Sequence, residues 1–354
     1  MKTKVLSFLY KHIAKPLFFK IDPEIVHTQM VKQGILLGRH GITKAGTQAL
    51  FSYQNKMLEC IVDGINFKNP VGLSAGFDYN ADLTQILPAV GFGFATLGTI
   101  TNQPYEGNPK PMLGRLPISK SLMVNKGFKN DGADAIIKKL TGLEFEIPIG
   151  ISIGRTNSHN KMTQRESVED TCETFRKFEN STVKHAYYEL NISCPNLFGN
   201  VSFYPSKNLE DLLTAVDVLG VKKPIWVKMP IEKSDKETLV MLEVISKHSP
   251  TAVIFGNLQK DRKDHALLPE EVAKFSIGNF SGKPTFKRSN ELISLTHKNY
   301  RDRFTIIGTG GIFSVKDAKE KLNRGAKLVQ LITGMVFEGP QLIGEINRGL
   351  THDR

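Results

Sequence analysis

The chain has 354 residues, 40% of them hydrophobic, and a formal net charge of +12. Such a chain can bury a substantial core, and no run approaches the roughly 20 apolar residues that cross a bilayer. Its start has neither a long hydrophobic stretch nor a small-residue cleavage site, so we expect no secretory signal. Cys60, Cys172 and Cys194 have no metal-ligand spacing and no disulfide framework. We therefore expect no bound metal and a reducing, cytoplasmic compartment.

The positive charge allows nucleic-acid binding as one interpretation. However, the Lys and Arg residues are spread along the chain, with no basic tract interleaved with aromatic residues and no recognisable reading motif. An anionic lipid surface, or a negatively charged substrate and a phosphate-bearing ligand, explains the excess more simply. We therefore expect no nucleic acid among the partners.

Residues 1–40 precede the first predicted strand and form a basic, amphipathic extension. Their pattern predicts two helices, 4–15 and 23–37, with Lys15-Pro16 between them. A basic amphipathic segment of this kind lies on a membrane rather than spanning it. The alternative is an ordinary helical cap that packs on the domain that follows. The apolar positions at helical spacing are Leu6, Leu9, Ile13, Leu17 and Phe18, and the lysines are Lys2, Lys4, Lys11, Lys15 and Lys20.

Residues 41–354 contain a regular series of eight short β-rich runs. Helix-like stretches lie between most of them, for example 208–219, 236–247 and 315–324. This alternation predicts an α/β fold, and eight such units predict a (β/α)8, or TIM, barrel. In that fold the chemistry lies at the carboxyl ends of the strands. The eight runs are 71–74, 94–98, 149–153, 187–192, 225–229, 252–255, 305–308 and 328–332.

Small residues end several of these runs. Ala75 and Gly76 follow the first run and Thr99 the second, where a short or missing side chain lets a ligand approach the backbone closely. The last two runs are followed by Gly310-Gly311 and Thr333-Gly334. Backbone amides at such ends bind anions without a basic side chain, so these glycines predict a phosphate cradle. For each glycine taken alone, a simple turn requirement is the alternative.

The most informative run is Asn191-Ile192-Ser193-Cys194-Pro195-Asn196, which follows the apolar, strand-like segment 187–190. Two carboxamides each offer a donor and an acceptor to a flat, amide-bearing ligand, and a thiolate beside them can remove a proton. A lone Cys in an apolar neighbourhood is otherwise a small buried hydrophobe. Because the run lies at a predicted strand end, we predict an active site there.

From about residue 22 to residue 350 the sequence resembles the dihydroorotate dehydrogenase family, most closely its membrane-associated, quinone-using class 2. The resemblance implies FMN-dependent oxidation of dihydroorotate to orotate in pyrimidine biosynthesis, with quinone as electron acceptor. It also implies a protein peripheral on the inner face of the cell membrane, whose N-terminal helices form a tunnel for the quinone. The motifs that carry the resemblance are Ala75-Gly76-Phe77-Asp78, Gly91-Phe92-Gly93-Phe94, Gly98-Thr99, Gly107-Asn108-Pro109-Lys110-Pro111, Asn191 to Asn196, Gly310-Gly311-Ile312, Thr333-Gly334 and Phe337-Glu338-Gly339-Pro340.

The resemblance also implies roles for individual residues. Cys194 stands where the family places its proton-abstracting base; class 2 usually has Ser there and class 1 has Cys. A thiolate is an effective base at neutral pH only if its surroundings lower its pKa. Lys228 matches a lysine beside the isoalloxazine, where a cation stabilises the charge of reduced flavin. The implied substrate-binding residues are Asn191, Asn196, Asn257, Tyr79 and Asn125, and the other implied FMN-binding residues are Ala75, Gly76, Thr99, Ser152, Asn191, Gly256, Gly282, Gly310, Gly311, Ile332, Thr333 and Gly334.

Several departures from the family pattern concentrate on the substrate. Tyr79 replaces a lysine that meets the substrate carboxylate, and Val124 replaces an asparagine, with Asn125 one residue away. A further pair, Leu258-Gln259, stands where the family has Thr-Thr, and Ser152 replaces an asparagine that touches flavin. Three interpretations stay open: a divergent dihydroorotate dehydrogenase, a paralogue acting on another, less acidic ring, and a flavin-binding protein without turnover. In the first, Lys126, Lys129 or Arg155 supplies the missing cation.

The segment 197–205 follows the predicted base and is a candidate gate. Gly199 can act as a hinge, and Phe198, Phe203 and Tyr204 can exclude water from the substrate. An ordinary surface loop is the alternative.

Overall fold

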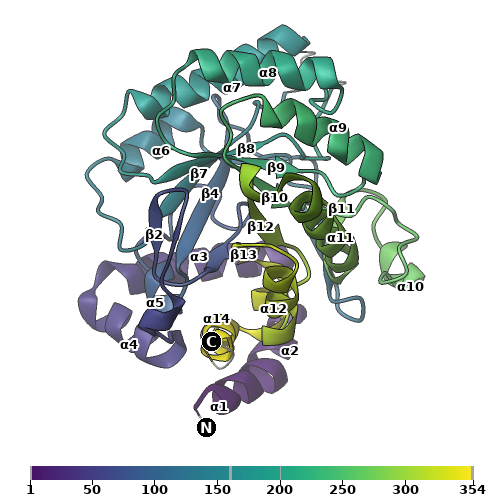
Figure 1. The fold of residues 1–354 in the computed structure, drawn as a ribbon. Helices are drawn as coiled ribbons and strands as arrows, with labels where there is room; N and C mark the ends of the chain where they lie inside the picture. The colour runs from purple at the N-terminus through teal and green to yellow at the C-terminus, as the bar shows by residue number, and fades with distance from the viewer. Residues whose placement is uncertain (1, 159–161, 200, 352–354) are drawn as a thin grey trace.

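The computed structural model describes residues 2–158, 162–199 and 201–351 and shows a closed barrel of eight parallel strands (Figure 1). The last strand pairs with the first, so the barrel has no open edge. Each of the eight predicted runs is a barrel strand, which confirms the predicted fold. The strands, in barrel order, are β3 (Val71–Leu73), β4 (Phe94–Ile100), β7 (Ile149–Ile153), β8 (Tyr187–Asn191), β9 (Ile225–Met229), β10 (Ala252–Phe255), β12 (Thr305–Thr309) and β13 (Leu328–Leu331).

Helices cover the outside of the barrel. The three helices predicted between barrel strands, 208–219, 236–247 and 315–324, are present, and each begins and ends within two residues of its predicted bounds. Two helices begin with capping boxes, Thr163 with Glu166 and Ser234 with Glu237, which satisfy free backbone amides of the first turn. The helices after β3 are α5 (Leu87–Val90), α6 (Ala133–Leu140), α7 (Gln164–Glu179), α8 (Ser206–Val218), α9 (Asp235–Ser246), α10 (Pro269–Val272), α11 (Lys283–Tyr300), η3 (Arg301–Arg303), α12 (Val315–Asn323), α13 (Thr333–Glu338) and α14 (Gln341–Leu350).

A hairpin that the sequence pattern did not reveal closes the amino end of the barrel. Strands β1 (Cys60–Val62) and β2 (Ile65–Phe67) follow the 3-10 turn η2 (Lys56–Leu58) and are joined by Asp63 and Gly64, both at positive φ. Phe67 packs against Trp226 inside the barrel. The Asp63 carboxylate accepts hydrogen bonds from the Trp226 indole at 2.8 Å and from two threonine hydroxyls, Thr251 and Thr305.

A small antiparallel sheet, also not predicted, lies at the carboxyl end of the barrel. It is formed by β5 (Leu113–Leu116), β6 (Ser121–Val124) and β11 (Asn279–Gly282), with β6 in the middle. Side chains of all three strands line the cavity described below. The sheet therefore forms a wall of the candidate site.

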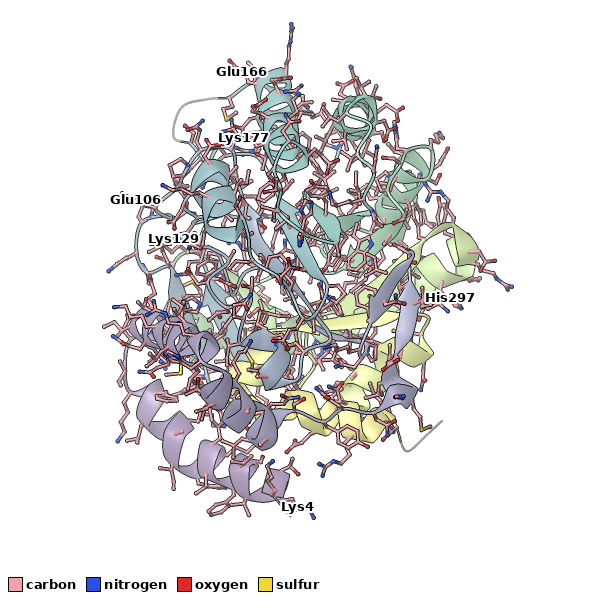
Figure 2. All side chains as sticks on the ribbon, turned by 90° about the vertical axis from the view of Figure 1, so that its left-hand side faces the viewer. Lys4, Glu106, Lys129, Glu166, Lys177 and His297 are labelled. Atoms are coloured by element: carbon pink, nitrogen blue, oxygen red, sulfur yellow. The ribbon has the colours of Figure 1, made fainter. Side chains whose placement is uncertain are left out.

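The N-terminal extension packs beside the C-terminal helix α14, and Figure 2 shows Lys4 at its outer end. The first helix extends further than predicted, because α1 (Lys2–Leu9) runs through a π-helical segment, η1 (Tyr10–Ala14), into α2 (Lys15–Phe19). The predicted interruption at Lys15-Pro16 is wrong, since Pro16 lies inside this continuous helical segment, just after its π-helical part. The second predicted helix is α3 (Pro23–Arg39). A further helix, α4 (Gly41–Phe51), follows it directly across residue 40.

Two local features fix this arrangement. The Asp22 carboxylate caps α3 by accepting from the amides of Glu24 and Ile25. The Tyr10 hydroxyl donates to the carbonyl of Val336 at 2.7 Å and so joins the extension to α13. In residues 2–158, 162–199 and 201–351 we find no helix with the length and apolar character needed to cross a membrane.

Candidate active site

A cavity of about 490 Å³ lies between the carboxyl ends of the barrel strands and the N-terminal helices. Residues at strand ends line one part of it, and apolar residues of α2, α3 and α4 line another, among them Phe18, Val26 and Phe51. A second cavity, of about 90 Å³, adjoins the first, because Ala75 and Lys228 line both. The large cavity is lined by these predicted site residues: Ala75, Gly76, Tyr79, Thr99, Asn191, Cys194, Asn196, Lys228, Asn257, Ile332 and Thr333.

The small cavity has the form of an anion cradle. It brings together five of the predicted glycines, Gly256, Gly282, Gly310, Gly311 and Gly334, which come from four different parts of the chain. A Cβ on Gly334 would collide with the carbonyl of Ile312, and Gly310 has a φ of +88° and no room for a Cβ beside Thr285. Only glycine leaves the backbone accessible there. The cradle therefore fits an anion such as the phosphate of a nucleotide, which backbone amides and the Thr333 hydroxyl would bind.

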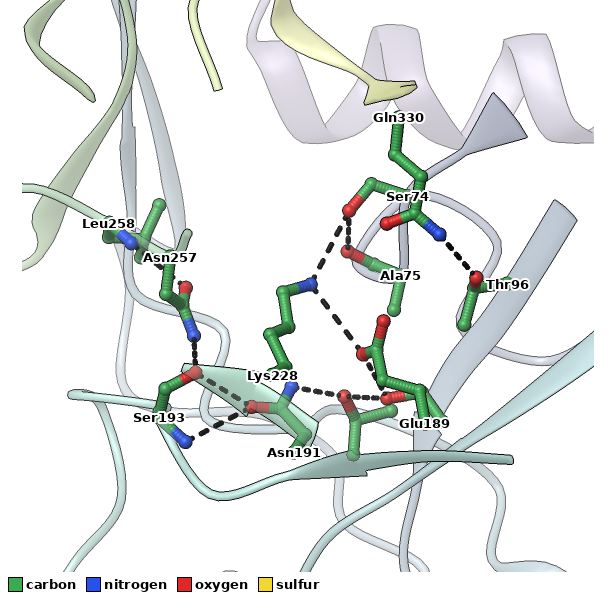
Figure 3. Close-up of polar contacts among 12 residues, drawn as sticks. Ser74, Ala75, Thr96, Glu189, Asn191, Ser193, Lys228, Asn257, Leu258 and Gln330 are labelled. Carbon is green, nitrogen blue, oxygen red and sulfur yellow. Dashed lines mark hydrogen bonds and ion pairs between the residues drawn. The ribbon is translucent and has the colours of Figure 1, made fainter. Parts of the chain in front are cut away.

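A continuous chain of polar contacts crosses the floor of the large cavity (Figure 3). The Lys228 ammonium lies 3.6 Å from a carboxylate oxygen of Glu189, and the Ser152 hydroxyl donates to that same oxygen at 2.7 Å. Because Ser152 donates to Glu189, the Thr99 hydroxyl donates to Ser152, at 2.9 Å. The Asn191 amide then donates to Thr99 at 2.8 Å. Each donor along this chain points toward the Glu189 carboxylate.

The same chain fixes the orientation of two predicted substrate-binding amides. With its nitrogen on Thr99, Asn191 turns its oxygen to the backbone amide and hydroxyl of Ser193. The Asn257 amide donates to the Ser193 hydroxyl at 2.8 Å, while its oxygen accepts from Leu258. Each carboxamide keeps a second N–H for a ligand, since an NH₂ group has two donors. The site can therefore present two oriented donors to the carbonyl groups of a ring.

Cys194 lies at the edge of this array and is partly exposed to the cavity. Burial raises the pKa of its thiol to about 11, although the Asn196 amide and the cations Arg155, Lys228 and Lys260 favour the thiolate. The condition for an effective base, a lowered pKa, is therefore not met by the surroundings of Cys194.

Two other predicted substrate residues are already engaged by the protein. The Asn196 amide donates to the carbonyl of Val124 and its oxygen accepts from Asn279. The Asn125 side chain contacts Asn108 and the carbonyl of Pro109. Asn196 lines the large cavity, but Asn125 lines neither cavity, so the structure brings only Asn196 to the site. Ser152 also lines neither cavity and reaches the site through Thr99.

Comparison with known proteins decides the family. The family model described as dihydroorotate dehydrogenase matches residues 57–353. The chain belongs to the dihydroorotate dehydrogenase family. It is 35% identical over 367 residues to "Dihydroorotate dehydrogenase (quinone)" of Synechococcus sp. (strain JA-2-3B'a(2-13)), covering 97% of this chain and 93% of that protein. It is also 35% identical over 348 residues to the protein of the same name from Christiangramia forsetii, covering 96% and 98%.

The solved structures agree on the fold. The crystal structure of Eimeria tenella DHODH in complex with ferulenol matches with a TM-score of 0.81 at 24% identity, covering 94% of this chain and 91% of that one. The protein is thus an oxidoreductase of the dihydroorotate dehydrogenase family built on a TIM barrel.

Three of the departures from the family pattern, Tyr79, Val124 and Leu258, line the large cavity. The centre of the Tyr79 ring lies 5.1 Å from that of the His27 ring and 5.2 Å from the Lys126 ammonium. Burial lowers the pKa of Lys126, and Glu24, 3.5 Å from its ammonium, opposes that shift. Val124 and Leu258 complete an apolar border. Of the three candidate cations, Lys126 and Lys129 line the cavity.

The third candidate cation, Arg155, is engaged elsewhere. Its guanidinium is buried and donates to the carbonyl of Phe198 at 2.6 Å. Arg155 thus holds the start of the candidate gate, 197–205, beside Cys194. Phe203 is buried, and the Tyr204 ring lies 4.9 Å from the Lys233 ammonium. Asn200, also in this segment, lies outside the described residues. Gate closure stays a hypothesis.

Sequence reasoning missed Glu189 and Ser193. Glu189 lies in the strand-like segment 187–190 and Ser193 in the run 191–196, but no role is predicted above for either residue. The signal for Glu189 was present, because a carboxylate in an apolar strand two residues before Asn191 points to the same side of the sheet as Asn191. Ser193 carried no such signal, since its role in joining Asn191 and Asn257 depends on the meeting of two distant strands.

Proposed function

We propose that the protein oxidises dihydroorotate to orotate with FMN as cofactor and quinone as electron acceptor, as a step of pyrimidine biosynthesis. One observation carries the proposal: a single cavity joins the polar strand ends at Asn191 and Lys228 to an apolar passage among α2, α3 and α4. A polar ring substrate and a lipophilic acceptor both require access to the same flavin. The names of the relatives support the same pair of reactants.

FMN would be held by the glycine cradle at its phosphate and by Ala75, Gly76, Thr99 and Lys228 at its ring. When bound, it supplies the two-electron acceptor that takes a hydride from the substrate and passes the electrons to quinone. Lys228 would place a cation beside the ring, where it would stabilise the negative charge of reduced flavin. Asn191 and Asn257 orient the substrate through their free amide N–H groups.

Cys194 is the proposed base. Its Sγ, as thiolate, accepts the proton from one ring carbon while the hydride leaves the neighbouring carbon, so that the single bond between them becomes double. The neighbouring cation Arg155 favours the thiolate, and a closed segment 197–205 would keep water from the site. Because the pKa of the resting thiol is about 11, only a small fraction is active at neutral pH.

Lys126 is the proposed replacement for the family's missing lysine. Its ammonium borders the cavity over Tyr79, and Glu24 of α3 holds it there. A cation at this position can pair with the substrate carboxylate. The N-terminal extension would thereby help to form the substrate site.

The extension also carries the proposed membrane surface. Its exposed apolar side chains include Phe8, Ile13 and Leu17, each more than half exposed, and its lysines would face anionic lipid. We place the protein in the cytoplasm, peripheral on the inner face of the cell membrane. The polar residues of the apolar passage include Arg115, His27 and Tyr10, with Gln33 and Thr47, and these groups could meet a quinone head group.

A paralogous reaction on a less acidic ring is the second candidate, favoured by the apolar border of Tyr79, Val124 and Leu258. The two are separated by product analysis. The purified flavoprotein is incubated with dihydroorotate and a soluble quinone, and orotate is measured by its ultraviolet absorbance. Orotate formation supports the first proposal. A protein that binds flavin but forms no orotate would support the paralogous reaction, or a flavin-binding protein without turnover. A colourless protein would overturn both proposals.

A further inference from the structure

Glu189 is a carboxylate in the interior of the barrel. It extends from β8, and its exposed fraction is 0%. One of its oxygens, Oε1, accepts from Ser152 and faces the Lys228 ammonium at 3.6 Å. Its other oxygen, Oε2, has no hydrogen-bond partner in the described part of the chain. Figure 3 shows the carboxylate directed toward Lys228.

Such an arrangement is a poor way to stabilise a fold. A buried ion pair recovers its desolvation cost only when the remaining lone pairs are also satisfied, and here one oxygen lacks a partner. Asp63, a partly buried acid at the amino end of the barrel, accepts three hydrogen bonds from side chains and is an example of a satisfied, structural carboxylate. Incompletely satisfied buried charges next to a cavity are more typical of functional positions.

Lys228 is the partner that links Glu189 to the site. Its ammonium lies 3.4 Å from the Ser74 hydroxyl and lines both cavities, where the proposed function places FMN. At this depth charges interact strongly, because little water screens them. A carboxylate beside the ammonium therefore offsets much of the positive charge that the cofactor would meet.

We propose that Glu189 is the counter-ion of Lys228 and lowers the reduction potential of the bound flavin. Two-electron reduction places negative charge on the flavin, which Lys228 stabilises and Glu189 opposes. Glu189 does not touch the substrate or the cofactor in this account; its charge acts on the flavin at a distance and opposes the charge of Lys228. The inference rests on the proposed function, because it requires flavin at this site.

The test is the two-electron reduction potential of the flavin in a series of four proteins. These are the wild type, Glu189→Gln, Lys228→Met and the double variant, each purified with its flavin and titrated against a reference dye. Glu189→Gln should favour reduction by at least about tenfold, which is about 30 mV for a two-electron couple. Lys228→Met should shift the equilibrium the opposite way, and the double variant should lie between the two single variants.

A matched control separates charge from packing. Thr96→Val removes a buried hydroxyl that bonds Tyr187 and Gln330 in the same barrel interior but changes no charge. Its equilibrium constant for flavin reduction should stay within about threefold of the wild-type value. Glu189→Asp, which keeps the charge, should also stay closer to the wild type than Glu189→Gln does.

The outcomes are distinguishable. If Glu189→Gln does not retain flavin, the comparison of Lys228→Met with the double variant measures the same loss of negative charge. Removal of Glu189 without a shift in either comparison overturns this inference while leaving FMN binding intact. Wild-type protein that binds no flavin overturns the proposed function instead.

Discussion

The ammonium of Lys126 lies 5.2 Å from the centre of the Tyr79 ring, and Glu24 of helix α3 is 3.5 Å from that ammonium. Tyr79 stands where the family pattern has a lysine. The ammonium that lies over its ring belongs to Lys126, in the loop that follows β6. This relationship links the N-terminal extension, the barrel and the proposed substrate carboxylate.

We expect Lys126→Met to raise the KM for dihydroorotate about tenfold to a hundredfold, the cost of losing one charge-assisted contact. Lys129→Met is the matched control, because Lys129 also lines the cavity but lacks the contact with Tyr79. Steady-state kinetics of both variants make the measurement. A large effect of Lys129→Met with none of Lys126→Met would show that the cation is not Lys126.

Cys194→Ala should lower the rate of flavin reduction by dihydroorotate about 10²- to 10⁴-fold, because the general base is lost. Cys194→Ser should retain part of the rate, since a hydroxyl can still accept the proton. Both variants should keep bound flavin, which the visible spectrum reports. Loss of flavin in the Ala variant would instead indicate that Cys194 is structural.

The pH dependence follows from the raised pKa of Cys194, about 11. The base must be deprotonated, so the active fraction grows as the pH rises toward that value. We expect the rate constant of flavin reduction to rise by about tenfold per pH unit between pH 7 and 9. Stopped-flow absorbance measures it, with Cys194→Ala as the pH-independent control. A wild-type rate that is flat over this range would contradict the role of the thiolate.

Membrane association should depend on the apolar side chains of the extension. Phe8→Asp combined with Ile13→Asp should reduce sedimentation with anionic lipid vesicles more than about tenfold, because two apolar contacts are lost and negative charge is added. Ile118→Asp is the control, since Ile118 is 74% exposed but lies on the turn between β5 and β6. Equal sedimentation of both proteins would indicate that the extension is a cap on the barrel only.

Removing the Asp63 carboxylate should test the closure of the barrel's amino end. Asp63→Ala leaves the Trp226 indole without its acceptor and frees two threonine hydroxyls. We expect the free energy of unfolding to fall by about 2–4 kcal/mol, measured by urea denaturation, with an unchanged flavin spectrum. A stability within 0.5 kcal/mol, about the scatter of surface substitutions, would mean that the hairpin contributes little.

The barrel was predictable because its strands are short, apolar and separated by amphipathic helices, a pattern that local sequence carries. The β1–β2 hairpin and the β5–β6–β11 sheet were missed because their short strands are only half buried, whereas barrel strands of the same length are fully buried, largely apolar runs. In the sheet, β11 also pairs with a strand more than 150 residues earlier in the chain.

The glycines and strand-end amides of the site were predictable from the sequence, whereas the contacts between its side chains were less so. Asn191 and Lys228 follow directly from the strand ends, whereas the Lys126–Tyr79 contact depends on how a loop and the extension fold over the barrel. Asn125 shows the limit most clearly. Its side chain forms hydrogen bonds with Asn108 and with the carbonyl of Pro109 and does not line the cavity. That Asn125 lies one residue from the family's asparagine position does not reveal these contacts.

The most direct measurement mixes the oxidised protein with dihydroorotate in the absence of oxygen and follows the visible absorbance of the flavin. The proposed function predicts rapid bleaching in the wild type and slow bleaching in Cys194→Ala. A yellow protein that dihydroorotate does not bleach would contradict dihydroorotate as the substrate.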